Sequence, residues 1–203
     1  MKDHEIQFEK VTDGLAENGF AVVDDFLSVQ EVNQITKLKE FTSGLAGMKK
    51  AGIGKSTGKQ INEAIRGDFI QWIDPANAPG SVKLYFDRMK ELMTYLNRSL
   101  FLSLKDIEAH MTVYPEGSYY KRHLDQFRAD DHRKLSAICY LNNDWLEEHG
   151  GQLRMYLKSG SQDVFPIAGR LVCFRSEMIE HEVLPASRPR LSLTGWFVDE
   201  MRD

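Results

Sequence analysis

The sequence has few of the features that mark secreted or membrane-bound proteins. Its 203 residues include only two cysteines, Cys139 and Cys173, too few for a disulfide framework or a four-cysteine zinc site. Both lie in apolar segments, so we expect buried thiols in a reducing compartment. No segment approaches the roughly 18 consecutive apolar residues of a membrane span, and the charged N-terminus lacks the apolar stretch of a secretory signal. We therefore expect a cytoplasmic protein with no membrane partner.

Basic residues are not in excess, and the chain contains no internal repeat, low-complexity tract or linker. Lys and Arg number 26 against 30 Asp and Glu, and the net charge of −4 argues against nucleic acid as the main partner. Hydrophobic residues make up 42% of the chain, which is enough to fill a core. We therefore expect a single domain over residues 1–203, with helical support over residues 1–104 and a β-core over residues 105–203.

Helices and short strands share the first half of the chain. From apolar spacing we expect helices over residues 5–17, from Ser28 onward and over residues 80–102, and strands over residues 20–26 and 68–73. Ser28 and Glu31 have the spacing of a capping box. Residues 44–65 contain five glycines and four lysines and are expected to form a mobile loop. This loop is either a lid over a substrate or an ordinary connection.

Beyond residue 105 the helical periodicity disappears, and short apolar runs alternate with turns rich in glycine and proline. We expect eight strands, at residues 107–114, 118–124, 134–142, 152–157, 163–167, 169–175, 178–184 and 190–198. Short strands at this spacing are typical of a sandwich, a barrel or a jelly roll. The N-terminal helices would cover one face, so the predicted fold class is α+β with a β-core.

One histidine lies two residues before a carboxylate in a strand-like segment. Side chains two residues apart on a strand point to the same side, so His123 and Asp125 can meet at one metal ion. His181, in the strand expected over residues 178–184, is the best candidate for a third ligand. Two histidines and one carboxylate are the ligands of many non-haem Fe(II) oxygenases, and a zinc hydrolase can use the same set. These residues alone leave both kinds of site open.

The last expected strand carries a cation on its inner side. Arg190 and Thr194 face the side opposite to Leu191 and Leu193. An arginine inside a barrel is costly unless it meets an anion, and its guanidinium can grip a carboxylate through two parallel hydrogen bonds. A metal site beside such an arginine predicts a cosubstrate that bears a carboxylate. Arg188, in the preceding turn, is the alternative, but we expect it to face solvent.

Several short motifs follow one another from about residue 65 to residue 199. They are Ile65–Asp68, Gln71–Ile73, Val113–Pro115, Tyr120–Asp125, Tyr140–Trp145, Gly150–Arg154, His181–Val183, Arg190 and Trp196–Phe197. In identity and order they resemble the 2-oxoglutarate- and Fe(II)-dependent dioxygenases, specifically the prolyl hydroxylases that act on hypoxia-inducible factor and their bacterial relatives. From its length we expect no appended domain, and in this the chain resembles the bacterial members. It departs from the animal enzymes between Tyr114 and His123 and over residues 126–133, at the mouth of the site.

The resemblance implies a fold and a set of ligands. The core would be a double-stranded β-helix, which is a jelly roll. His123, Asp125 and His181 would hold Fe(II). Arg190 would pair with the distal carboxylate of 2-oxoglutarate.

The resemblance also implies roles for residues around this centre. The hydroxyls of Tyr140 and Thr194 would assist in binding 2-oxoglutarate, and Tyr114 would line the iron pocket near the cosubstrate and the target proline. Leu153 and Trp196 would form apolar walls, or would simply be core residues.

The activity implied by the resemblance is hydroxylation of a prolyl residue of a protein at C4, with succinate and CO2 as coproducts. Fe(II) would be the cofactor, 2-oxoglutarate and O2 the cosubstrates, and ascorbate the reductant. The partner would be a protein substrate, with a translation elongation factor as first candidate. The alternatives are a hydroxylase of a small molecule or free amino acid, and a metal-binding jelly roll that senses without turnover.

Other charged and imidazole side chains lead to smaller expectations. Asp68 is expected to pair with Arg133 and so to anchor one end of the 44–65 loop. His110 lies on an expected strand and either faces the pocket or packs in the core. The histidines that sit among charged residues are expected to be solvated: His4, His132 and His149.

Overall fold

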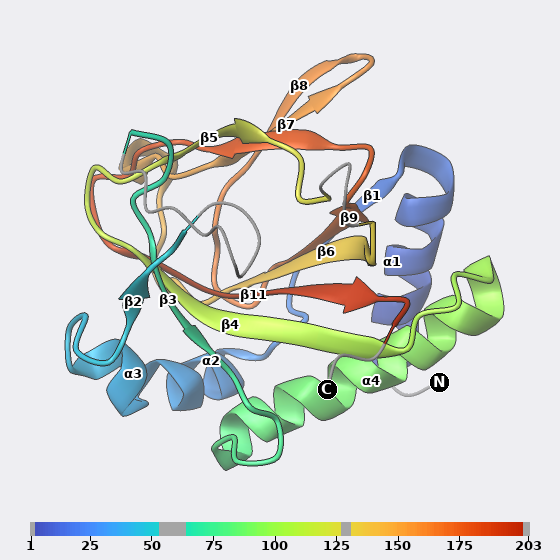
Figure 1. The fold of residues 1–203 in the computed structure, drawn as a ribbon, viewed down its shortest axis with the longest axis horizontal. Helices are drawn as coiled ribbons and strands as arrows, with labels where there is room; N and C mark the ends of the chain where they lie inside the picture. The colour runs from blue at the N-terminus through green and yellow to red at the C-terminus, as the bar shows by residue number, and fades with distance from the viewer. Residues whose placement is uncertain (1–2, 53–63, 127–130, 201–203) are drawn as a thin grey trace.

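A computed structural model describes residues 3–52, 64–126 and 131–200, and its elements follow the expected order (Figure 1). The first half contains α1 (Asp3–Asn18), β1 (Phe20–Val23), α2 (Val29–Thr36), α3 (Lys39–Thr42), β2 (Lys49–Lys50), β3 (Phe69–Trp72) and α4 (Gly80–Leu100). Helix α1 ends where predicted, because Gly19 adopts the left-handed conformation with φ 77°. The predicted capping box begins α2: the Ser28 hydroxyl accepts from the Glu31 backbone N–H, and the Glu31 carboxylate accepts from the Ser28 N–H.

Strands make up most of the described part of the second half. They are β4 (Asp106–Tyr114), β5 (Tyr120–His123), β6 (Arg133–Tyr140), β7 (Leu153–Leu157), β8 (Gly160–Val164), β9 (Leu171–Arg175), β10 (Glu180–Val183) and β11 (Arg190–Val198). A short 3-10 helix, η1 (Glu147–His149), precedes β7. β8 begins three residues earlier than the predicted strand at residues 163–167. It does so because β7 turns back tightly and pairs Leu157 with Gly160.

The strands form two antiparallel sheets that face each other (Figure 1). The larger sheet has the order β1-β9-β6-β11-β4-β3-β2, and the smaller sheet has the order β5-β10-β7-β8. Helices α1 and α4 lie along the outer side of the larger sheet, away from the smaller one. This architecture confirms the predicted double-stranded β-helix core buttressed by N-terminal helices.

Successive residues of the central strands point to opposite faces of the larger sheet, which creates two cores. On the outer face, Leu193 and Phe197 of β11 belong to the core that includes the helices. On the inner face, Tyr140 of β6 and Phe174 of β9 belong to a second core with Leu153 of the smaller sheet. Leu153, predicted as an apolar wall, is fully buried there.

The segment 44–65 differs from its prediction in its first part. Strand β2 pairs with β3, and Met48 and Ala51 on either side of it are buried, so this part packs onto the sheet instead of forming an open loop. Residues 53–63, where the rest of the predicted mobile loop or lid falls, lie outside the described residues.

Two expectations from composition can be compared with the structure. Cys139 and Cys173 are free thiols buried in the outer core, as predicted. Among the helices that the structure describes, none combines the length and the apolar character needed to cross a membrane.

Candidate metal centre

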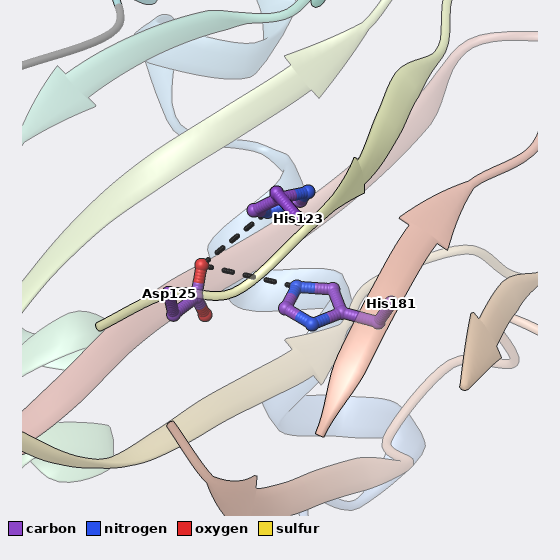
Figure 2. Close-up of side chains that lie close together, drawn as sticks. All are labelled: His123, Asp125 and His181. Carbon is purple, nitrogen blue, oxygen red and sulfur yellow. Dashed lines mark ion pairs between the residues drawn. The ribbon is translucent and has the colours of Figure 1, made fainter. Parts of the chain in front are cut away.

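Three side chains meet at one point, from β10 and from β5 with the bend that follows it (Figure 2). β10 pairs antiparallel with β5, which sets His181 directly opposite His123. β5 ends at His123, and the chain then bends, so that Asp125 turns toward both imidazoles. Asp125 Oδ1 lies 3.4 Å from His123 Nε2 and 3.8 Å from His181 Nε2. The structure thus brings together the three residues that the sequence singled out.

Hydrogen bonds fix the orientation of both imidazole rings. His123 Nδ1 lies 2.7 Å from the carbonyl oxygen of Lys121, and His181 Nδ1 lies 3.0 Å from that of Ile179. A carbonyl oxygen only accepts hydrogen bonds, so each Nδ1 carries the proton and each Nε2 presents its lone pair to the shared space. Burial lowers the pKa of His181 to about 4, although Asp125 acts in the opposite direction. His181 is therefore neutral at neutral pH, which is the form that binds metal.

The two oxygens of Asp125 have different surroundings. Oδ1 faces the imidazoles, whereas Oδ2 accepts a hydrogen bond of 2.7 Å from Ser136 Oγ and one of 3.0 Å from Trp196 Nε1. Burial by itself raises the pKa of this carboxyl, but His181, His123 and Ser136 outweigh burial and hold the pKa of Asp125 well below its usual value. Asp125 is therefore ionised and presents one oxygen to the imidazoles.

The donor set fits a ferrous ion. The ligand atoms of His123, Asp125 and His181 all lie within 4.8 Å of one another, and such separations suit one ion held about 2 Å from each atom. Within the described part of the chain, this is the one group of three or more such side chains, so a structural zinc site closed by four protein ligands has no fourth ligand there. Two histidines and one carboxylate with open positions are typical of non-haem Fe(II) oxygenases.

A buried guanidinium lies on the inner face of the larger sheet. Arg190 begins β11 and is only 2% exposed. Its Nε donates to the carbonyl oxygen of Gly151 at 3.0 Å, and its Nη2 donates to Tyr140 Oη at 3.2 Å. Gly151 has φ 71°, and a Cβ there would lie 2.9 Å from the Cβ of Ala186, so a larger residue does not fit beside the arginine.

Arg190 has no acidic partner within the residues that the structure describes. A buried charge without a counter-ion is strongly unfavourable. The hydrogen bonds to Gly151 and Tyr140 use two of the five N–H donors of the guanidinium. The pocket is therefore suited to an anionic ligand, as predicted from the alternation of β11.

The other predicted cosubstrate residues differ in how close they come to Arg190. Tyr140 bonds to it directly, and Tyr114 lies opposite it in the strand register, with the ring centroid 5.2 Å from the guanidinium carbon. Burial raises the pKa of Tyr114 well above its usual value, so its hydroxyl stays protonated. Thr194 Oγ1 lies 3.0 Å from Ser192 Oγ, and its described hydrogen bonds do not include one to Arg190.

A stack of side chains behind His123 was not predicted. The Tyr120 ring lies parallel to the His123 ring, with centroids 3.6 Å apart and an interplanar angle of 18°. The guanidinium carbon of Arg66 lies 4.2 Å from the centroid of Tyr120. A cavity of about 360 Å³ opens beside Arg66 and is lined in part by Lys50 and Pro115. The motifs containing Arg66 and Tyr120 were visible in the sequence, but nothing in one sequence indicates that they stack.

The predicted ion pair between Asp68 and Arg133 is wrong. Asp68 instead accepts two hydrogen bonds from Arg66, of 2.7 Å and 2.6 Å. The two residues are close in sequence and line the same cavity. Arg133 instead lies 3.5 Å above the Trp196 ring, and its Nε donates to Glu108 Oε1 at 3.3 Å.

Two histidines outside the centre have defined places. His132 is buried, with Nε2 2.9 Å from Glu108 Oε1, so the prediction that it is solvated is wrong. His110 is buried against Trp72 and Trp196, with ring centroids 5.0 Å and 5.5 Å away, and its Nδ1 lies 2.8 Å from Thr112 Oγ1. His110 therefore packs in an aromatic cluster and is not part of the group of three.

Comparison with known families and proteins agrees with this geometry. The family model described as the 2OG-Fe(II) oxygenase superfamily matches residues 109–198, a range that contains the three clustered side chains and Arg190. Human Egl nine homolog 1 is 31% identical over 210 residues, which cover 96% of this chain and 47% of the human protein. The chain thus spans about half the length of this relative.

Solved structures extend the likeness over the whole chain. A prolyl-4-hydroxylase from Pseudomonas putida is 42% identical, with a TM-score of 0.86, over 96% of this chain and 100% of that one. A prolyl hydroxylase from Trichoplax adhaerens, solved with a peptide fragment of the hypoxia-inducible factor oxygen degradation domain, is 29% identical, with a TM-score of 0.83 over 98% of this chain and 91% of that one. The chain therefore belongs to the 2OG-Fe(II) oxygenase superfamily and, within it, to the prolyl hydroxylases.

Proposed function

We propose that this protein is an Fe(II)- and 2-oxoglutarate-dependent dioxygenase that hydroxylates a prolyl residue of a protein substrate at C4. One observation carries the proposal: a buried arginine without an acidic partner among the described residues accompanies an open site of two histidines and one carboxylate. The 42% identity to the prolyl-4-hydroxylase of Pseudomonas putida supports proline as the target. The family description names Fe(II) and 2-oxoglutarate, and we assign O2 as the second cosubstrate and ascorbate as the reductant from the resemblance to prolyl hydroxylases.

In this proposal the Nε2 atoms of His123 and His181 and the Oδ1 atom of Asp125 hold Fe(II). When bound, the ion supplies the redox chemistry that couples conversion of 2-oxoglutarate into succinate and CO2 to hydroxylation of the substrate. The chain orients both imidazoles through Nδ1, keeps His181 neutral and keeps the carboxylate ionised.

Arg190 receives the distal carboxylate of 2-oxoglutarate in this proposal. The guanidinium retains N–H donors that Gly151 and Tyr140 do not use. Tyr140 Oη accepts from Arg190, so its own proton remains available for the same carboxylate. Thr194 faces the same side of β11 and is assigned to this pocket with Tyr140.

Tyr114 is the residue that we assign beside the reacting groups. Its ring lies beside Arg190, which supports a place near the cosubstrate, and burial keeps its hydroxyl protonated. Tyr114 therefore acts as a hydrogen-bond donor that orients the cosubstrate or the target proline, and it does not act as a general base.

We propose a protein as the substrate, with a translation elongation factor as the first to be tested because the sequence resembles bacterial prolyl hydroxylases. The cavity of about 360 Å³ beside Arg66 supports a substrate larger than a single amino acid. Arg66 stacks on Tyr120, and Tyr120 stacks on His123, so the cavity offers room for neighbouring substrate residues close to the metal centre. We further propose a cytoplasmic location, which the free, buried thiols of Cys139 and Cys173 support.

The experiment is to incubate the protein with Fe(II), 2-oxoglutarate, ascorbate and either purified elongation factor or free proline. Succinate release and peptide mass spectrometry are then measured together. We expect succinate release that depends on the protein substrate, and one prolyl residue heavier by one oxygen atom. Oxygen addition to free proline alone would favour the small-molecule alternative. Metal binding without succinate release from any substrate would favour a sensor.

A further inference from the structure

We propose that Ser136 and Trp196 are positioning residues that hold Asp125 as a ligand through one oxygen only. The inference rests on the proposed function, because it concerns how the carboxylate of that metal site is presented. Ser136 and Trp196 were assigned no such role by the sequence, where Trp196 was expected to be an apolar wall.

The strand register brings the two donors to one oxygen. Trp196 of β11 pairs directly with Ser136 of β6, and both side chains point to the inner face of the larger sheet. Their donors converge on Oδ2 of Asp125, at 3.0 Å and 2.7 Å. Oδ1 faces the two imidazoles. The division of the two oxygens is therefore built into the pairing of two central strands.

Neighbouring side chains fix both donors in direction. The single Ser136 hydroxyl proton goes to Asp125, so Ser176 Oγ, 2.9 Å from Ser136 Oγ, must donate to Ser136. The Trp196 ring is 7% exposed and is held between the guanidinium of Arg133 at 3.5 Å and the ring of His110 at 5.5 Å. Neither donor is free to follow Oδ2 if that oxygen turns toward the imidazoles.

This arrangement has a consequence for the number of open positions. If the bound ion offers six positions, three single-atom protein ligands would leave three, two for the keto-acid end of 2-oxoglutarate and one for O2. A carboxylate that bound through both oxygens would take one of them. By engaging Oδ2, Ser136 and Trp196 keep that position available. The hydrogen bonds also orient a metal ligand from outside, and such contacts typically contribute 10–100-fold to metal affinity.

The test compares Ser136→Ala, Trp196→Phe and the double variant with the natural protein, using Co(II) titration followed by visible absorption. Trp196→Phe keeps a buried aromatic ring but removes the N–H donor together with part of the indole, and Ser136→Thr restores the hydroxyl. Trp145→Phe is the matched control, because Trp145 is also 7% exposed and its Nε1 donates to the carbonyl oxygen of Gly150 at 3.1 Å. Thr12→Val controls for loss of a buried hydroxyl in α1, where Thr12 Oγ1 donates to the carbonyl oxygen of Phe8.

We expect each of Ser136→Ala and Trp196→Phe to weaken Co(II) binding about tenfold and to change the cobalt spectrum, and Ser136→Thr to restore both. In turnover, the KM for O2 should rise while the KM for 2-oxoglutarate stays within about twofold. The two control variants should bind Co(II) like the natural protein. If Ser136→Ala does not fold, Trp196→Phe alone decides the result.

The outcomes separate this inference from the proposed function. If the natural protein bound no Co(II), or bound it equally well after Asp125→Ala, the metal site itself would be wrong. If the natural protein bound Co(II) through Asp125, but Trp196→Phe left the affinity, the spectrum and the KM for O2 unchanged, only the positioning role would be overturned.

Discussion

The two faces of the larger sheet are built from the same strands but have different chemistry. On the outer face, residues such as Leu193 and Phe197 of β11 are fully buried among apolar side chains of the helices. On the inner face, the same strand presents Arg190, Ser192 and Trp196, all buried and all with polar groups. The comparison shows how one strand serves stability on one side and binding on the other.

The difference in chemistry carries an energetic consequence. Apolar burial on the outer face stabilises the fold, whereas buried polar groups on the inner face are costly unless each finds a partner. Ser136 and Trp196 on the inner face find such a partner in Asp125. Arg190 lacks an acidic one among the described residues, and it therefore marks where the fold has been adapted to a ligand.

The largest expected effect is on metal affinity at the site between the two sheets. His181→Ala should lower Fe(II) affinity by more than the roughly 10–100-fold typical of residues outside the ligand set. It should leave the helical and strand signals of circular dichroism unchanged, because the outer core is untouched. Equilibrium dialysis under nitrogen measures the affinity, with His4→Ala in α1 as control. Unchanged Fe(II) affinity in His181→Ala would contradict the assignment of metal binding to this site.

A substitution on the outer face should do the opposite. Phe197→Ala removes a fully buried ring from the outer core, and we expect the free energy of unfolding to fall by roughly 3–5 kcal/mol. Urea unfolding measures this change. At a temperature where the variant stays folded, its Fe(II) affinity should match that of the natural protein. A large loss of metal affinity with little loss of stability would show that the two faces are not separable.

Arg190→Ala should affect 2-oxoglutarate without affecting the metal. The loss of even one charge-assisted hydrogen bond costs roughly 1.5–3 kcal/mol, so we expect the KM for 2-oxoglutarate to rise at least about 10–100-fold. Fe(II) affinity should stay constant. The neighbouring Arg188→Ala serves as control, because Arg188 lies in the turn before β11. Turnover of Arg190→Ala at ordinary 2-oxoglutarate concentrations would contradict the assignment.

The smallest effect concerns acid stability of the inner aromatic cluster. Burial, reinforced by Arg66 and Arg133 and opposed by Asp68 and Asp125, lowers the pKa of His110 from 6.5 to about 3. The unfolded chain takes up this proton near pH 6.5 and the folded chain does not until about pH 3, so stability falls as the pH falls through this window.

At pH 5 the lowered pKa of His110 reduces the free energy of unfolding by about 2 kcal/mol relative to neutral pH. His110→Gln should remove it, so that the stability of the variant declines less steeply between pH 7 and pH 5. Urea unfolding of both proteins at several pH values measures the two slopes, and contributions from His181 and other shared groups cancel in their difference. Equal slopes would mean that His110 is not held neutral by burial.

Much of the fold was predictable because each strand and helix has its own periodicity. The alternation of Arg190 and Thr194 with Leu191 and Leu193 indicated which side of β11 faces inward, and the structure agrees for Arg190 and Leu193. The cluster of His123, Asp125 and His181 was likewise predictable, because a histidine two residues before a carboxylate and a histidine on another strand limit the choices. The predicted reason was only half right, since β5 ends at His123 and Asp125 reaches the imidazoles from the bend that follows.

What remained hidden depends on register and on turns. The pairing of Trp196 with Ser136 follows from how β6 and β11 align, which one sequence does not fix. The choice of Arg66 over Arg133 as partner of Asp68 depends on the path of the chain before β3. His132 was expected in solvent because it lies among charged residues, yet Glu108 on β4, distant in sequence, gives it a partner.

A crystal structure of the protein with Mn(II) and 2-oxoglutarate tests the central claim most directly. We predict one ion bound by His123 Nε2, His181 Nε2 and Asp125 Oδ1, and the distal carboxylate of 2-oxoglutarate on Arg190 and Tyr140. An ion bound elsewhere, or 2-oxoglutarate with its distal carboxylate away from Arg190, would contradict the account.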